Sequence, residues 1–224
     1  ATMTDVNSIP QVIPGYQLLE KLGQGGMGAV YKARQLSVDR IVALKVMPKR
    51  LAQDEEFRER FFREARAVGR LNHPNIVAAY DASEANGYCY IAMEFVEGEP
   101  LDARVKRLGP LPEPEALKIS QQAAEGLMCA WSAGLVHRDV KPENILYSTN
   151  HVAKLCDLGI SKSQADAGLT QEGKAIGTPR YISPEQARGS STVDYRADVY
   201  SLGATLYHLL SGEPPFDGDT PAII

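Results

Sequence analysis

The sequence contains few cysteines, and none of them is spaced to bind a metal. Cys89, Cys129 and Cys156 are the three cysteines among the 224 residues, and no Cys-x-x-Cys pair occurs. An odd number of scattered cysteines argues against a disulfide framework or a zinc site and favours reduced thiols. We therefore expect a cytoplasmic location.

Long apolar runs and charge of one sign are also absent. No uninterrupted apolar stretch approaches the ~20 residues that a membrane-spanning helix requires, and no secretory signal is evident. The net charge is -4, and basic residues are interspersed with acidic ones rather than gathered in an arginine-rich block. These absences argue against a membrane-spanning segment in this chain and against a nucleic-acid partner.

What the sequence does contain is enough apolar material for a substantial core. Hydrophobic residues make up 44% of the chain, and its length allows one domain or two lobes. Residues 1–14 show no periodicity and contain Pro10 and Pro14, so they predict a flexible tail.

The most specific pattern is His-Arg-Asp-Val-Lys-Pro-Glu-Asn at residues 137–144, followed by Asp-Leu-Gly at 157–159. Phosphoryl transfer needs a carboxylate that orients the attacking hydroxyl, and an amide and a second carboxylate that hold magnesium on the phosphates. Asp139, Asn144 and Asp157 supply these three groups. A solvated loop would account for any one of them but not for the whole pattern.

A glycine-rich segment lies upstream, where Gly23, Gly25 and Gly28 form a Gly-x-Gly-x-x-Gly pattern. This pattern alone also fits a dinucleotide-binding turn between a strand and a helix. Here, β-branched and aromatic runs at residues 29–33 and 41–46, separated by a polar turn, predict an antiparallel hairpin instead. We therefore expect a glycine flap whose backbone N–H groups approach the phosphates of a nucleotide.

Lys45, near the end of this hairpin, is expected to hold two of those phosphates. An ammonium in such a site needs an acidic partner, because an unpaired charge is costly to remove from water. In the next segment, residues 57, 61, 64 and 68 share one face of a predicted helix, and Glu64 is the only charged residue on that face. We predict that Glu64 pairs with Lys45.

Taken together, these motifs resemble the eukaryotic-like protein kinase family, in its bacterial form, from about Tyr16 to Phe216. The resemblance implies an α+β, two-lobed protein kinase fold. It places an antiparallel β-sheet N-lobe with one helix at residues 15–95 and a mainly helical C-lobe at 96–224. Members of the family continue with further helices, so we expect a fragment that lacks the last helices of the C-lobe and exposes an apolar flank of the helix that ends near Leu210.

The expected elements follow from the same reading. They are strands up to residue 46, a helix near 55–70, strands near 76–81 and 88–95, and long helices over Pro114–Trp131 and Asp198–Leu210. The first of these long helices is predicted to have one apolar face, made of Ala116, Ile119, Ala123, Leu127 and Ala130.

The resemblance also implies a nucleotide site. Met93 occupies the gatekeeper position, and the backbones of Glu94 and Val96 are expected to bind adenine. Val30, Ala43 and Leu146 would enclose the adenine ring, a role that coincides with ordinary core packing. The implied ATP-binding residues are Leu22, Gly23, Gly25, Gly28, Val30, Ala43, Lys45, Met93, Glu94, Val96 and Leu146.

The implied activity is transfer of the γ-phosphoryl group of MgATP to serine and threonine hydroxyls of proteins. Asp139 would orient the hydroxyl, while Asn144 and Asp157 would bind Mg²⁺. Lys141 is typical of serine/threonine kinases and would help to neutralise the transferred phosphate. Thr178 would hydrogen-bond to Asp139 and Lys141.

Two positions depart from the usual family pattern. Leu158 replaces a phenylalanine and keeps an apolar side chain at that position. Ser183 stands where alanine is usual. We expect no consequence for activity from either change.

Regulation is predicted in residues 160–176, which are polar and lack apolar periodicity, as in a mobile loop. Arg138 implies the kinase class in which a phosphate holds this loop. Thr170 is the preferred phosphosite, formed by autophosphorylation. Ser161, Ser163 and Thr178 remain alternatives.

Three functional hypotheses stay open at this point: an active serine/threonine kinase, a nucleotide-binding scaffold without transfer activity because its C-lobe is incomplete, and a non-catalytic interaction module. The partners of an active kinase would be a protein substrate and a second copy of the chain, in a homodimer that phosphorylates itself in trans. In bacterial members of the family a membrane span often follows the kinase domain, so membrane tethering with the kinase on the cytoplasmic side is also considered.

Overall fold

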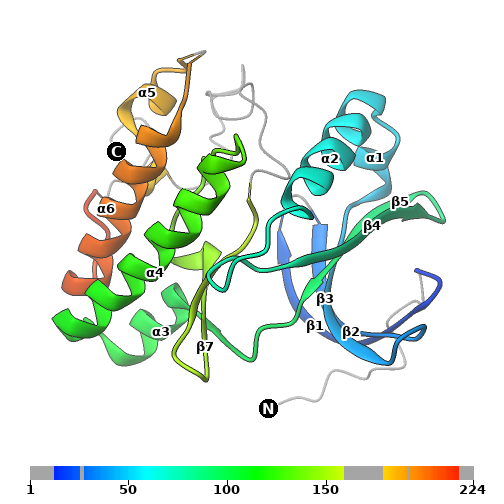
Figure 1. Ribbon diagram of the computed structural model, residues 1–224, viewed down its shortest axis with the longest axis horizontal. Helices are drawn as coiled ribbons and strands as arrows, with labels where there is room; N and C mark the ends of the chain where they lie inside the picture. The colour runs from blue at the N-terminus through cyan, green and yellow to red at the C-terminus, as the bar shows by residue number, and fades with distance from the viewer. Residues whose placement is uncertain (1–12, 26–27, 159–178, 191, 217–224) are drawn as a thin grey trace. The chain divides into compact units, whose positions relative to one another are not determined.

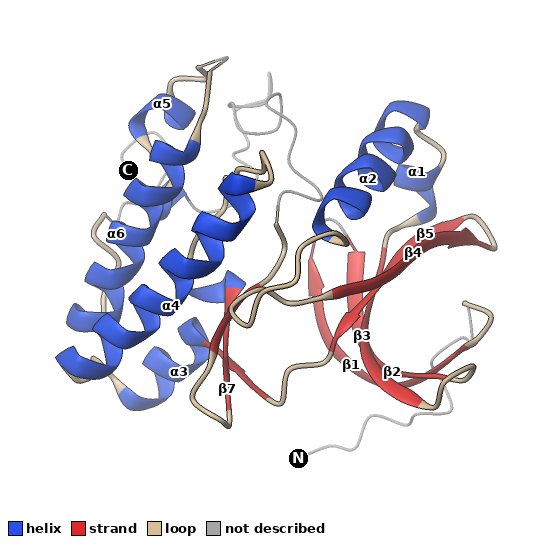
Figure 2. Cartoon of the chain, viewed as in Figure 1, coloured by secondary structure: helices blue, strands red, loops and turns tan. Residues whose placement is uncertain are grey.

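The computed structural model describes residues 13–25, 28–158, 179–190 and 192–216, which form two compact units (Figure 1). The first comprises the described residues within Ala1–Arg70 and Ala78–Val96, and the second those within Leu71–Val77 and Glu97–Ile224. Figure 2 shows strands as the main content of the first unit and helices as that of the second. Each unit has its own cluster of buried apolar side chains.

The first unit is built on a five-stranded sheet in the order β1-β2-β3-β5-β4, with antiparallel pairing throughout. The strands are β1 (Tyr16–Gly25), β2 (Gly28–Gln35), β3 (Arg40–Val46), β4 (Ala79–Ala85) and β5 (Tyr88–Glu94). The hairpin predicted from residues 29–46 is confirmed as β2 and β3. Its turn contains Asp39 with a φ of 53°, a conformation that aspartate tolerates better than most residues.

Side chains alternate between the two faces of this sheet, as strand geometry requires. One face carries the apolar core of the unit, with Val42, Leu44 and Val46 of β3 at its centre. The opposite face carries the intervening residues of β3, Ala43 and Lys45.

Two helices belong to the first unit, α1 (Lys49–Ala52) and α2 (Glu55–Val68). Asp54 caps α2, since its carboxylate accepts a hydrogen bond from the backbone N–H of Phe57 at 3.0 Å. The buried residues of α2 are Phe57, Phe61, Ala65 and Val68. The sequence predicted α2 but not the single turn of α1.

Strand β4 begins later than the sequence predicted. Ile76 and Val77 precede it and belong to the second unit, where both side chains are buried. Ile76 forms a parallel bridge with Leu155, and the N–H of Val77 donates to the carbonyl of Leu155 at 2.9 Å. The apolar run that indicated a strand near 76–81 is therefore divided between the two units, and its buried residues, Ile76 and Val77, belong to the second.

The second unit contains a small sheet and four α-helices among its described residues. The sheet has the order β6-β7-β8, with strands β6 (Gly98–Pro100), β7 (Ile145–Ser148) and β8 (Ala153–Leu155). The helices are α3 (Leu101–Leu108), α4 (Glu113–Ser132), α5 (Pro184–Ala187) and α6 (Tyr195–Ser211).

Helix α4 crosses the core of this unit. The apolar face that the sequence predicted is confirmed, because Ala116, Ile119, Ala123, Leu127 and Ala130 are all buried. Gly126 lies on the same face, where a Cβ atom would come within 2.7 Å of the backbone oxygen of Asn75. Helix α6 buries Ala197, Asp198, Ser201, Ala204, Thr205 and Leu209, and exposes Val199, Tyr207 and Leu210.

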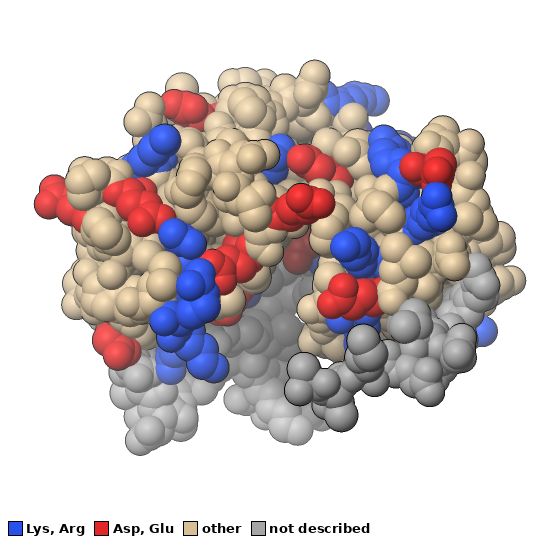
Figure 3. Space-filling model, turned by 90° about the horizontal axis from the view of Figure 1, so that it is seen from below, with Lys and Arg blue, Asp and Glu red and all other residues tan. Residues whose placement is uncertain are grey.

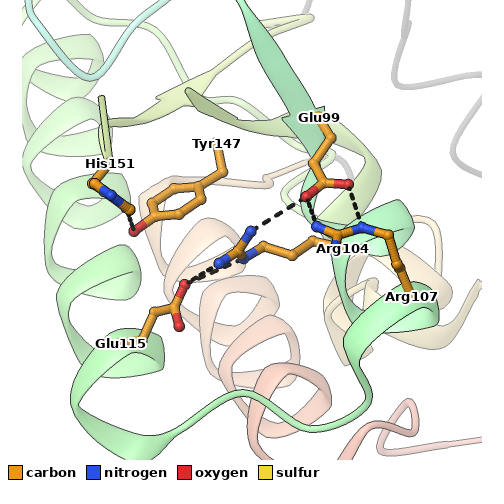
Figure 4. Close-up of polar contacts among 6 residues, drawn as sticks. All are labelled: Glu99, Arg104, Arg107, Glu115, Tyr147 and His151. Atoms are coloured by element: carbon orange, nitrogen blue, oxygen red, sulfur yellow. Dashed lines mark hydrogen bonds and ion pairs between the residues drawn. The ribbon is translucent and has the colours of Figure 1, made fainter. Parts of the chain in front are cut away.

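A polar cluster connects β6, α3, α4 and β7 (Figure 4). Arg104 of α3 donates to Glu99 at 3.3 Å and to Glu115 of α4 at 2.7 Å, and its guanidinium lies 4.9 Å from the ring centroid of Tyr147. Arg107 also pairs with Glu99. Arg104 therefore links three elements around one buried aromatic ring.

Neither unit contains a described helix that is both long and apolar enough to span a membrane. Figure 3 shows Lys and Arg side chains interspersed with Asp and Glu on one face of the described residues.

Candidate active site

The residues of the 137–144 pattern form a compact cluster in the second unit. The carboxylate Oδ2 of Asp139 lies 3.2 Å from Nζ of Lys141 and accepts a hydrogen bond from Nδ2 of Asn144 at 2.9 Å. The Asn144 amide also donates to the backbone carbonyl of Asp139 at 2.8 Å. Asp139 and Lys141 remain partly exposed, so a reactant can approach them.

The buried carboxylate of Asp198 fixes the backbone of the loop that carries Asp139. Asp198, at the start of α6, is 0% exposed and accepts hydrogen bonds from the N–H groups of His137 and Arg138 at 2.8 and 2.7 Å. It also accepts one from Nε1 of Trp131 at 2.9 Å. Three donors satisfy a charge that would otherwise be costly to bury. They also hold Arg138 in the left-handed region, with a φ of 64°.

The His137 side chain hydrogen-bonds to the backbone of the same loop and to that of Cys156. Its Nε2 donates to the backbone carbonyl of Cys156 at 3.1 Å, and its Nδ1 accepts from the N–H of Asp139 at 3.3 Å. A single neutral tautomer satisfies both contacts. Because the ring is fully buried and both nitrogens are engaged, its position indicates a structural role.

Asn144 and Asp157 lie on adjacent segments of the second unit. The N–H of Cys156, the residue before Asp157, donates to the backbone carbonyl of Asn144 at 3.0 Å. Both amide protons of Asn144 are directed to Asp139, so its side-chain carbonyl is the atom able to bind a cation. Asp157 has a φ of 59°, in the left-handed region that aspartate tolerates better than most residues.

This donor set fits magnesium. Mg²⁺ prefers oxygen ligands and is usually bound through one or two carboxylates together with substrate phosphates. The second unit offers an amide oxygen and a carboxylate. Within the described residues no group of three or more His, Cys, Asp or Glu side chains is arranged to bind a metal. Water and phosphate oxygens commonly supply the other ligands of Mg²⁺.

In the first unit, the predicted nucleotide-binding residues share one face of the sheet. Val30 pairs with Lys45 across β2 and β3, and Ala43 pairs with Met93 across β3 and β5. Directly paired residues project to the same side of a sheet, as do residues two apart on one strand. Val30, Ala43, Lys45 and Met93 therefore lie on one face of the sheet together with Lys32, which pairs with Ala43, and Lys45 is only 7% exposed.

Glu64 lies beside the buried stripe of α2 rather than at its centre. Ala65 occupies the central position together with Phe61 and Val68, and Glu64 is half-buried. The helical wheel drawn from the sequence placed positions 57, 61, 64 and 68 on the apolar face; in the structure that face also includes Ala65, and one carboxylate oxygen of Glu64 is buried. Its pairing with Lys45 stays a prediction.

Glu94 is the last residue of β5, and Val96 follows two residues later. The N–H of Glu94 donates to the carbonyl of Ala78 at 2.8 Å. Adenine binding by the Glu94 and Val96 backbones stays a prediction. The Glu94 carboxylate accepts from the N–H of Ala78 at 3.3 Å. This side-chain contact was not foreseen. Val96 is half-buried.

The glycine-rich segment lies at the ends of β1 and β2. Leu22, Gly23 and Gly25 belong to β1, and no atom lies within 4 Å of a Cβ built on either glycine. At Gly28 a Cβ would lie 2.2 Å from the Val46 carbonyl oxygen, and its φ is 134°. The open space at Gly23 and Gly25 can accept a phosphate chain, whereas Gly28 is required by the sheet itself.

The remaining predicted site residues are distributed as follows. Leu146 lies on β7 of the second unit and is half-buried. Thr170 and Thr178 lie outside the described residues.

Sequence reasoning missed two residues next to the catalytic loop. Ser183 caps α5 in a reciprocal capping box with Gln186, and both side chains are buried. The Gln186 side chain reaches the backbone carbonyl of Arg138 at 3.0 Å. A serine followed three residues later by glutamine is a recognisable capping-box signal. The expectation that Ser183 has no consequence overlooked it.

A further polar pair joins Tyr181, two residues before Ser183, to His208 of α6. Tyr181 donates to Nδ1 of His208 at 2.6 Å. Burial raises the pKa of the Tyr181 hydroxyl, and burial lowers the pKa of His208 below its ordinary value.

Comparison with known proteins gives consistent matches. A sequence model described as the protein kinase domain matches residues 16–223. Serine/threonine-protein kinase PknB of Mycobacterium leprae is 46% identical over 220 residues, which cover 96% of this chain and 35% of the relative. PknB of Mycolicibacterium smegmatis is 49% identical over 215 residues, which cover 93% of this chain and 34% of the relative. The chain thus spans about a third of the length of these curated relatives.

Solved structures give the same result. A crystal structure of the Mycobacterium tuberculosis PknI kinase domain superposes with a TM-score of 0.74 at 36% identity, and the match covers 91% of this chain and 75% of that one. A second crystal structure, of a mutant form of that domain, has the same TM-score and identity and is covered to 76%.

Proposed function

Because the chain belongs to the protein kinase family, whose domain model matches residues 16–223, we propose that it catalyses transfer of the γ-phosphoryl group of MgATP to serine and threonine hydroxyls of proteins. The observation that carries this proposal is the Asp139, Lys141 and Asn144 cluster on the backbone fixed by Asp198. A carboxylate, a cation and an amide oxygen are thereby held in one loop, as phosphoryl transfer requires.

In the proposed mechanism, Asp139 accepts a hydrogen bond from the acceptor hydroxyl and takes up its proton. Asn144 keeps the carboxylate oriented through its contact with Oδ2, and Lys141 places a positive charge 3.2 Å from the same oxygen. This ammonium can neutralise charge on the group in transfer. MgATP, when bound, supplies the phosphoryl group and a divalent charge on its phosphates.

We propose nucleotide-related roles for residues in each unit taken separately. In the first, the apolar surface of Val30, Ala43 and Met93 is suited to an adenine ring, and Lys45 to phosphate. In the second, Asn144 and Asp157 are proposed to bind Mg²⁺. Each ligand type matches its target, since planar apolar rings need desolvated walls and magnesium needs oxygen.

We further propose regulation by autophosphorylation at Thr170, carried out in trans between two copies of the chain. The support comes from Arg138, whose buried Nε has no hydrogen-bond partner among the described residues. A buried guanidinium N–H without a partner is well suited to a phosphate. MgATP chemistry and the free thiols of Cys89, Cys129 and Cys156 fit a kinase domain that works on the cytoplasmic side.

The hydroxyl specificity can be tested with three peptides that differ only at the acceptor, which is serine, threonine or tyrosine. We expect phosphate on the serine and threonine peptides and at least about tenfold less on the tyrosine peptide. Equal phosphorylation of all three would contradict the proposed specificity. ATP binding without phosphate on any peptide would instead favour the nucleotide-binding scaffold.

A further inference from the structure

Gln186 makes contacts through both atoms of its side-chain amide. The residue lies on α5 and is 3% exposed. Its Oε1 accepts hydrogen bonds from the N–H and the hydroxyl of Ser183 at 3.2 and 3.1 Å, and its Nε2 donates to the Arg138 carbonyl at 3.0 Å. A buried side chain that joins two segments 48 positions apart in the sequence is more than a local helix cap.

The direction of this amide is determined by its partners. An N–H can only donate and a carbonyl oxygen can only accept. Rotation of the Gln186 amide by half a turn would place its oxygen against the Arg138 carbonyl and its nitrogen against the Ser183 N–H. Both contacts would then be repulsive. The backbone N–H of Ser183 and the Arg138 carbonyl therefore select the orientation in which Gln186 presents a donor to the catalytic loop.

The contact acts on the peptide unit next to the catalytic carboxylate. The carbonyl of Arg138 and the N–H of Asp139 belong to one rigid plane, since peptide bonds are planar. The other side of Arg138 is held by Asp198 through its N–H at 2.7 Å. Arg138 has a φ of 64°, which is unfavourable for a side chain with a Cβ, so the backbone needs restraint on both sides to stay there.

We infer that Gln186 is a positioning residue, which fixes the peptide plane before Asp139 and thereby the direction of its carboxylate. The Asp198 carboxylate holds the N–H of Arg138, and the Gln186 amide holds the carbonyl of the same residue. The N–H of Ser183 keeps the Gln186 amide in this orientation. The inference rests on the proposed kinase activity for its catalytic readout.

Two substitutions test whether Gln186 acts through its hydrogen-bond donor or only by filling space. Gln186→Glu preserves size and the capping box, since glutamate serves in that motif as well. At neutral pH its carboxylate faces the Arg138 carbonyl, and the two acceptors repel. Gln186→Met fills similar volume without any donor. For both we expect kcat to fall about tenfold near pH 8, with KM for MgATP unchanged within about twofold.

The pH profile distinguishes positioning from packing. Burial raises the pKa of a carboxyl group, and the protonated form has an O–H that can donate to the Arg138 carbonyl. As the pH is lowered from about 8 to about 6, kcat of Gln186→Glu relative to the wild type should recover at least about threefold. The Met variant should show no recovery. A constant loss in both variants, or wild-type kcat in either, would overturn the inference.

A measurement that does not depend on catalysis keeps the inference separate from the proposed function. Amide hydrogen exchange should be at least about tenfold faster at Asp139 in Gln186→Met than in the wild type, while β3 of the first unit is unchanged. Ser183→Ala, which retains the amide donor, should show a smaller increase and serves as a second variant if the position-186 variants do not fold. Wild-type exchange at Asp139 in the variants would overturn the inference even if the chain transferred no phosphate.

Discussion

At the scale of single residues, the glycine-rich segment contains positions of different kinds. Gly28 adopts a φ of 134° and lies against the Val46 backbone, whereas Gly23 has open space beside it. The sequence pattern presents these glycines as equivalent members of one loop. The structure indicates that Gly28 is required for folding and that Gly23 is available for ligand approach.

Gly28→Ala should therefore lower the free energy of unfolding by about 2 kcal/mol, because a Cβ would collide with a backbone oxygen and the φ is unfavourable. Gly23→Ala is the matched control. It should change stability by less than about 0.5 kcal/mol and reduce ATP affinity instead. Urea unfolding and nucleotide titration measure the two effects. Equal destabilisation by both substitutions would refute this distinction.

The sequence predicted the candidate catalytic residues better than it predicted the contacts that hold their backbone in place. Asp139, Lys141 and Asn144 lie in one short segment, so their proximity follows from their spacing. The Gln186 to Arg138 contact spans distant segments, and nothing in the local pattern reveals which carbonyl a glutamine will reach. On α2 the wheel placed Phe57, Phe61 and Val68 on the buried face, where the structure has them, but it did not reveal that Ala65 is buried as well, because a wheel does not fix how a helix rotates against its neighbours.

At the scale of secondary-structure elements, the long helices were predictable and the short ones were not. Helix α4 has a sustained apolar period, and its buried face matched the prediction at every position named. Helix α1 and the strands β6 and β8 are three or four residues long, which is too short for a period to show. Strand β4 was misplaced because Ile76 and Val77 pack with the other unit.

Arg104 should be the main stabilising residue of the polar cluster in the second unit. Its side chain is 19% exposed and bridges Glu99 and Glu115, whereas that of Arg107 is 55% exposed. Arg104→Met should lower the unfolding free energy by about 2 kcal/mol, since it leaves two partly buried carboxylates without their common partner. Arg107→Met should cost less than about 0.5 kcal/mol. Denaturant unfolding followed by circular dichroism tests this order, which the reverse ranking would contradict.

The contact between Tyr181 and helix α6 should make stability depend on pH. Burial lowers the pKa of His208 below its ordinary value of 6.5, so the folded state binds fewer protons than the unfolded state in this range. Stability is then fully present above about pH 6.5 and is lost as the pH falls towards the lowered pKa. His208→Gln should flatten this dependence. Unfolding free energies at several pH values measure it, and an unchanged slope in the variant would exclude His208 as the cause.

At the scale of the whole molecule, the sequence predicted two folding units with different compositions. The resemblance to protein kinases implied the β-rich first part and the mainly helical second part, and the long helices α4 and α6 of the structure lie in the second part. The assignment of Leu71–Val77 to the second unit did not follow from period. It depends on hydrogen bonds to Leu155, which is distant in sequence.

The central claim is that the Asp139 carboxylate enables phosphoryl transfer from MgATP. Its most direct test is mass spectrometry of the chain after incubation with MgATP, alongside Asp139→Asn, which preserves shape and removes the charge. We predict phosphate on the wild type, with Thr170 as the main site, and none on the variant, while ATP affinity agrees within about twofold. Equal phosphate on both, or ATP binding by the wild type without any phosphate incorporated, would contradict the claim.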